Sequence, residues 1–142
     1  MKQTFYLLLA VAILIILSSC NSQDGKYIVY KSESRFSVDD LGQQLKKKFA
    51  GQEYVLKFTD KYVKMSTPDS KASIVLAKVF MIPNADDYTL STIEGADSVR
   101  VEYQLEVRPD QIKFTVGASR KGHVTMLGNE ATVDFYLSKA VN

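Results

Sequence analysis

The segment VRVEYQLEV, residues 99–107, shows the clearest two-residue period in the chain. Its odd positions are apolar or aromatic, and the positions between them carry Arg, Glu, Gln and Glu. Because successive side chains of a β-strand point to opposite faces, this alternation predicts a strand with one face in a core and the other in water. Tyr103, the middle residue, is expected at the centre of that core.

Further segments on both sides of this strand have the composition of strands, with β-branched and aromatic residues between turn signals. They cover residues 26–32, 54–58, 62–66, 73–82, 88–93, 112–116 and 124–137, the last with a break near Gly128. The connections between them are short, and short turns join antiparallel neighbours. The sequence therefore predicts an antiparallel meander of about eight strands.

One helix is predicted after the first of these strands. Ser37 is a suitable N-cap, since its hydroxyl can accept a hydrogen bond from a free N–H of the first turn. Three lysines at residues 46–48 fill the expected last turn, where the helix dipole favours cations, and Gly51 follows as the C′ residue. Four apolar residues recur at helical spacing and define the face that should be buried: Val38, Leu41, Leu45 and Phe49.

These elements predict a mainly β (α+β) fold, formed by a single domain of residues 26–142. A meander with one apolar face must cover that face, either by closing into a small barrel or by curving strongly around the helix. Both architectures fit the pattern. The layout of a first strand, an early helix and a meander resembles small calycin-type or lipocalin-like barrels. The Gly-x-Trp motif of lipocalins is absent, because the chain has no tryptophan.

The first 20 residues have the features of an export signal. Lys2 is followed by an uncharged apolar run, FYLLLAVAILIIL at residues 5–17. This run is shorter than the roughly 20 residues that a membrane-spanning helix needs, and it matches the apolar region of a signal peptide. It leads into Leu17-Ser18-Ser19-Cys20, which contains the only cysteine of the chain. The arrangement resembles the lipobox of bacterial lipoprotein signal peptides.

The resemblance implies that residues 1–19 are a signal peptide, that Cys20 is lipidated, and that residues 20–25 form a short tether. The Cys20 thiol would carry a diacylglyceryl group through a thioether, and two or three acyl chains together hold a protein stably on a membrane. The expected location is the cell membrane or the outer membrane. The outer membrane is favoured in a Gram-negative bacterium, because Asn21 is not the aspartate that marks inner-membrane retention.

Composition and motifs give no indication of an enzyme. The net charge of +2 is too small for a nucleic-acid-binding surface. His123 is the only histidine, and the nearest serine lies outside the G-x-S-x-G context of a hydrolase. Gly117 and Gly122 have the spacing of a phosphate loop, but His123 and Val124 replace the required Lys and Ser/Thr. The sequence thus predicts a non-enzyme with no catalytic residues, metal ligands or cofactor.

Two classes of function remain. The first is an envelope binding module, whose domain faces the periplasm or the cell surface and holds a small apolar ligand or an envelope protein partner. The 8 tyrosines and 7 phenylalanines are residues that line such cavities. The alternative is an inhibitor or immunity-type lipoprotein that blocks a toxin or hydrolase through a loop. A large cavity within the sheet would favour the first class, and a solid core with a protruding charged loop would favour the second.

Overall fold

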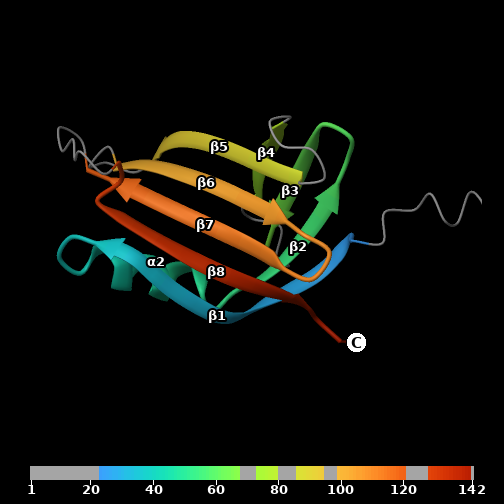
Figure 1. Cartoon of the computed structure of the whole chain (residues 1–142), viewed down its shortest axis with the longest axis horizontal. Coiled ribbons are helices and arrows are strands. Elements are labelled where there is room, and N and C mark those ends of the chain that lie inside the picture. The colour runs from blue at the N-terminus through green and yellow to red at the C-terminus, as the bar shows by residue number, and fades with distance from the viewer. Residues whose placement is uncertain (1–22, 68–72, 80–85, 95–98, 121–127, 142) are drawn as a thin grey trace, which may run out of the picture.

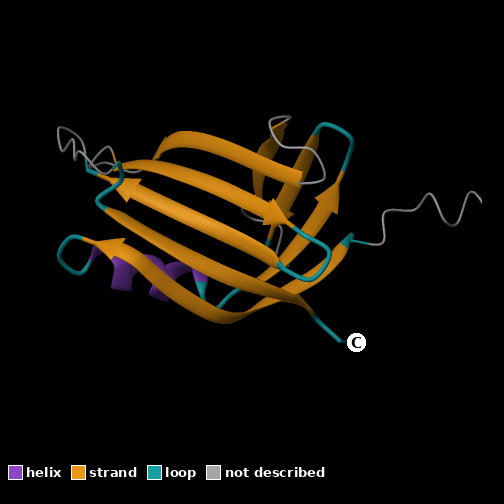
Figure 2. Cartoon of the chain, viewed as in Figure 1, coloured by secondary structure: helices purple, strands orange, loops and turns teal. Residues whose placement is uncertain are grey.

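The computed structural model describes residues 23–67, 73–79, 86–94, 99–120 and 128–141. Within these ranges the chain forms one helix and eight strands (Figure 2). In chain order the elements are β1 (Gly25–Ser37), α2 (Leu41–Phe49), β2 (Glu53–Phe58), β3 (Tyr62–Ser66), β4 (Ser73–Val79), β5 (Asp86–Glu94), β6 (Val99–Val107), β7 (Ile112–Ser119) and β8 (Ala131–Lys139). Across the same ranges, no helix has the length and apolarity needed to cross a membrane.

The strands form a closed, antiparallel barrel (Figure 1). Each strand pairs with the next one in the chain, and β1 closes the barrel by pairing with both β2 and β8. The predicted mainly β fold with one helix after the first strand is therefore confirmed. Of the two architectures that the sequence left open, the closed barrel is the one formed, and closure pairs the N–H and C=O groups that sheet edges would expose.

β1 is longer than the sequence predicted, because it serves two partners. Residues 25–28 pair with β2, and residues 27–37 pair with β8. The register along β8 shifts between Val29 and Lys31 and again between Ser34 and Phe36. Such irregularities interrupt the two-residue alternation on which sequence prediction relies.

α2 lies where β1 is no longer paired with β2. Past its first four residues β1 pairs with β8 alone, and the chain returns through α2, which contacts both β1 and β8. The last helical residue, Phe49, lies in the core. Its ring centre lies within 6.1 Å of the ring centres of Tyr103, Phe114 and Phe135. The helix is therefore part of the barrel packing rather than a cover on the outer surface.

The start of the helix differs from the prediction. Ser37 is the last residue of β1, and Asp40 is the N-cap, without a side-chain cap hydrogen bond. Between them Asp39 adopts a left-handed φ of 55°, which turns the chain from the strand into the helix. The Ser37 hydroxyl nevertheless accepts a hydrogen bond from the Gly42 N–H at 2.8 Å. The predicted N-cap was wrong in position, yet Ser37 does satisfy a first-turn N–H.

The rest of the helix agrees with its sequence. Leu45 and Phe49 are buried on one face, whereas Val38 precedes the helix. The lysines at residues 46–48 lie in the last turn, and Gly51 directly follows the C-cap residue.

Buried apolar and aromatic side chains fill the interior of the barrel. Four of the five odd positions of β6 are buried, and Val99 is partly buried, so the predicted alternation is confirmed. Tyr103 is 1% exposed and stacks on Phe114, with ring planes 8° apart. The largest fully buried apolar and aromatic side chains come from β2, β3, β4, β6, β7 and β8: Tyr103, Phe114, Phe135, Leu56, Met65, Leu76, Leu105, Val63, Val116 and Val133.

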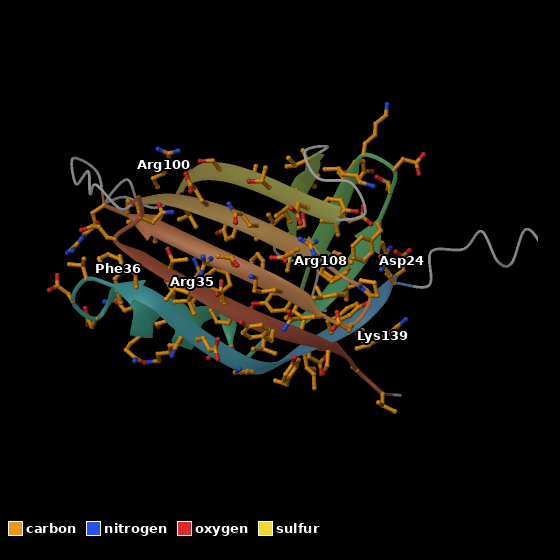
Figure 3. The ribbon with its side chains drawn as sticks, viewed as in Figure 1. Asp24, Arg35, Phe36, Arg100, Arg108 and Lys139 are labelled. Carbon is orange, nitrogen blue, oxygen red and sulfur yellow. The ribbon has the colours of Figure 1, made fainter. Side chains whose placement is uncertain are left out.

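The barrel has two ends. We call the end where β1 begins the near end, because it is the end closest to the N-terminal segment. It carries Asp24, the β2–β3 turn at residues 59–61 and the β6–β7 turn at residues 108–111. The far end carries Arg100 and the β1–α2 connection at residues 38–40. Figure 3 shows Asp24 and Arg100 at opposite ends of the molecule.

Candidate functional site: a pocket at the barrel mouth

A pocket of about 570 Å³ lies between the C-terminal end of α2 and the ends of β2, β3 and β4 that point away from the near end. We call it the mouth pocket. Its wall consists of Phe49, Tyr54, Met65, Ile74 and Tyr103, and its rim consists of Lys48, Gln52, Ser66, Thr67 and Ser73. The wall residues belong to the inward-facing set that also builds the core.

The pocket arises because the strands of the barrel differ in length. β2 and β3 have 6 and 5 residues, whereas β5 and β6 have 9 each. At about 3.3 Å per residue, the short strands are roughly 10 Å shorter than the long ones. α2 fills part of the missing wall with Phe49, and the space left beside it opens onto Tyr103 of β6.

The aromatic wall is held in place by the protein itself. The Tyr54 hydroxyl donates a 2.7 Å hydrogen bond to the Phe49 carbonyl, which ties β2 to the end of α2. Burial raises the pKa of the Tyr54 hydroxyl well above its usual value, so this group stays neutral and remains a donor. The Phe49 ring meets Tyr103 edge to face at an interplanar angle of 73°. The wall is therefore formed before any ligand enters.

The described rim residues are polar and include the cation Lys48. Lys48 is exposed, and its Nζ lies 5.3 Å from the Phe49 ring centre. The Gln52 side chain donates a 2.9 Å hydrogen bond to the Lys48 carbonyl. Among the described residues that line the pocket, none has a carboxylate, an imidazole or a thiol. An apolar interior below a polar, cationic rim fits a small apolar molecule whose polar group stays at the mouth.

A second hollow, of about 370 Å³, lies over the outer face of the barrel. It is lined by charged groups that already have partners. Asp134 accepts hydrogen bonds from the Arg35 guanidinium at 2.9 and 3.1 Å and from the Thr115 hydroxyl at 2.7 Å. Figure 3 shows Arg35 on the outer surface beside β8. This cluster fastens the irregular part of β1 to β8, and we assign it to stability.

The residues singled out in the sequence fall into two groups. Cys20, Gly122 and His123 lie outside the described residues. Gly117 and Ser119 lie within β7, where the Ser119 hydroxyl donates to Asn129 at 3.1 Å and serves the structure of the β7–β8 corner. In the part of the chain that the structure describes, no group of three or more His, Cys, Asp or Glu residues could hold a metal ion.

Sequence reasoning placed Tyr103 on the inner face of the sheet, and it did not separate pocket residues from core residues. The signal that could have found the pocket is the contrast between the short predicted strands at residues 54–58 and 62–66 and the long one at residues 99–107. Comparison with known proteins finds no matching family model, no matching curated protein and no matching solved structure.

Proposed function

We propose that this protein is a membrane-anchored bacterial lipoprotein whose barrel binds a small apolar ligand in the mouth pocket. The observation that carries the proposal is the pocket itself, an open cavity with an aromatic wall beside the buried core of the barrel. Its volume of about 570 Å³ falls within the range typical of small-molecule sites. The lipobox-like sequence that ends at Cys20 supports attachment to the membrane by acyl chains.

Two physical features favour binding of this kind of ligand. Apolar surface removed from water contributes about 25 cal/mol per Å², and the partly buried Ile74 side chain offers such surface in the pocket. The wall is preformed, so little conformational entropy is lost when a ligand enters. The rim also carries the cationic side chain of Lys48, and a ligand with an anionic polar group has the complementary charge.

Binding rather than catalysis is the activity that we propose. The pocket is lined by side chains of low reactivity, and its one described phenol pair, Tyr54 and Tyr103, includes a hydroxyl already bonded to a main-chain carbonyl. A general base or a nucleophile needs a titratable group close to the reacting atom, and the described lining offers only Lys48 and these phenols.

Ile74→Gln tests the pocket. Ile74 is partly buried against the core and lines the pocket. A glutamine amide facing an apolar ligand without a partner costs about 1–3 kcal/mol. Because each 1.4 kcal/mol is a factor of ten, we expect about tenfold weaker binding of N-phenyl-1-naphthylamine, an apolar fluorescent probe, in a fluorescence titration.

Val75→Gln is the matched control, because Val75 is the next residue on β4 and lies on the outer face with 46% exposure. The affinity of this variant for the probe should equal that of the parent protein. If both variants bind the probe like the parent, or if the parent does not bind it, the proposed function is wrong.

A further inference from the structure

The polar segment that was expected to be a free tether is fastened to the barrel from residue 23 onward. The Asp24 carboxylate accepts a 2.8 Å hydrogen bond from the Phe58 N–H at the end of β2. The Tyr27 hydroxyl donates a 2.6 Å hydrogen bond to the Gln23 carbonyl. Gly25 is already paired with β2. Residues 23–25 of the predicted tether are therefore attached to the barrel, and in the sequence Asn21 and Ser22 separate them from Cys20.

A linker this short limits the distance between Cys20 and the barrel. Consecutive Cα atoms are 3.8 Å apart, so the Cα atoms of Cys20 and Gln23 are separated by at most about 11 Å. A strand of nine residues such as β6 is roughly 30 Å long. The acyl chains therefore hold one end of the barrel close to the bilayer, while the other end is a strand length away.

The surface around Gln23 is shared with the β6–β7 turn. A hollow of about 430 Å³ at the near end is lined by Gln23, Tyr30, Lys139 and residues 108–112, among others. The β2–β3 turn is adjacent, because Asp24 bonds to Phe58 at its start. Exposed side chains of both signs lie on these turns, including Asp60, Lys61 and Asp110. Such a mixture matches the paired ammonium and phosphate groups of a lipid headgroup layer and opposes insertion of these two turns into hydrocarbon.

We infer that the barrel stands on the bilayer by its near end, with the β2–β3 and β6–β7 turns against the lipid headgroups and the mouth pocket turned away from them. The inference rests on the Cys20 anchor of the proposed function. The pocket rim at Ser66 lies four residues along β3 from the near end, which is about 13 Å. The ligand is therefore exchanged with the aqueous side rather than taken directly from the bilayer that carries the anchor.

Fluorescence quenching of two labelled variants tests this orientation. The lipidated full-length protein offers a single cysteine, and acylation occupies it, so an introduced cysteine is the only free thiol. Asp110→Cys places a fluorophore on the near end, and Arg100→Cys places one on the far end. In phosphatidylcholine vesicles with headgroup-attached nitroxide, quenching should be several-fold stronger for the label at position 110. Equal quenching, or stronger quenching at position 100, would overturn the inference.

Two controls separate the orientation from the anchor. Insertion of about 16 Gly/Ser residues between Ser22 and Gln23 adds a span of roughly 22 Å. With this insertion, the protein should still float with the vesicles. The labels at positions 110 and 100, each introduced in a separate variant, should then be quenched weakly and to the same extent. Cys20→Ser should abolish flotation. If Cys20→Ser floats as well as the parent protein, the proposed anchor is wrong and the orientation falls with it; if flotation needs Cys20 but the labels do not differ, only the orientation is wrong.

Discussion

Replacing Phe114 by alanine is expected to lower the free energy of unfolding by about 3–5 kcal/mol, the cost of removing a buried aromatic ring and leaving a cavity. Phe114 is 0% exposed, and its ring packs against Phe49, Tyr54, Tyr103 and Phe135. A domain of this size has only about 5–15 kcal/mol of stability in all. The variant should therefore be close to the limit of folding.

Urea unfolding of residues 21–142 measures this loss, because the core residues that the structure describes run from Tyr27 to Leu137. Lys113→Ala is the control: its side chain is on the outer face, where it forms a partly exposed ion pair with Glu106 at 3.0 Å. That change should cost at most about 1 kcal/mol. Similar losses of stability for the two variants would mean that the assignment of Phe114 to the inner face and Lys113 to the outer face of β7 is wrong.

Replacing Phe49 by alanine should cost about 3 kcal/mol or more, for the same reason, and should also weaken ligand binding. Phe49 joins α2 to the core through three aromatic contacts, and it forms one wall of the mouth pocket. Without the Phe49 ring, α2 loses its aromatic contacts with Tyr103 of β6 and Phe114 of β7. The mouth pocket also loses one of its walls. Urea unfolding and titration with N-phenyl-1-naphthylamine should both show the loss.

Gln44→Ala provides the comparison within the same helix. Gln44 is exposed, and alanine has the higher helix propensity, so the stability should change by less than about 0.5 kcal/mol and the probe affinity should not change. If Phe49→Ala had as little effect as Gln44→Ala, α2 would not be packed inside the barrel.

The β6 segment could be predicted from the sequence because one of its faces is buried along the strand and the other is turned toward solvent. Its inner residues meet only the core and its outer residues meet polar neighbours or water, so the chemical alternation is clean. The predicted bounds, 99–107, are those of the strand. β1 lacks this property, since its partner changes from β2 to β8 and its register shifts twice. Local pattern reasoning found only the part of β1 before residue 33.

Closure of the barrel left no local signal in the sequence. It depends on pairs such as Ile28 with Ser138, which are more than one hundred residues apart in the chain. The placement of the helix start failed for a related reason. Ser37 has the right chemistry for an N-cap, but pairing with Ala131 keeps it in β1, and Asp39 makes the turn instead. In both places tertiary pairing outweighs a local preference.

The mouth pocket was predictable only in its parts. Tyr103 follows the inward pattern, but the same pattern describes a filled core. Whether a space remains depends on how far α2 reaches over the short strands, and that distance is set by the packing of Phe49 against β6, β7 and β8. Lipidation at Cys20 remains a prediction from the lipobox-like sequence.

The most direct test of the account is to locate the bound ligand. In a titration of ¹⁵N-labelled protein, residues 21–142, with N-phenyl-1-naphthylamine, amide chemical shifts report where the probe lies. The account predicts the largest shifts at the residues that wall the mouth pocket, namely Phe49, Tyr54, Met65, Ile74 and Tyr103. Shifts that centre instead on Gln104 and Thr115 of the outer hollow, or that spread over the outer face of the barrel without a centre, would contradict it.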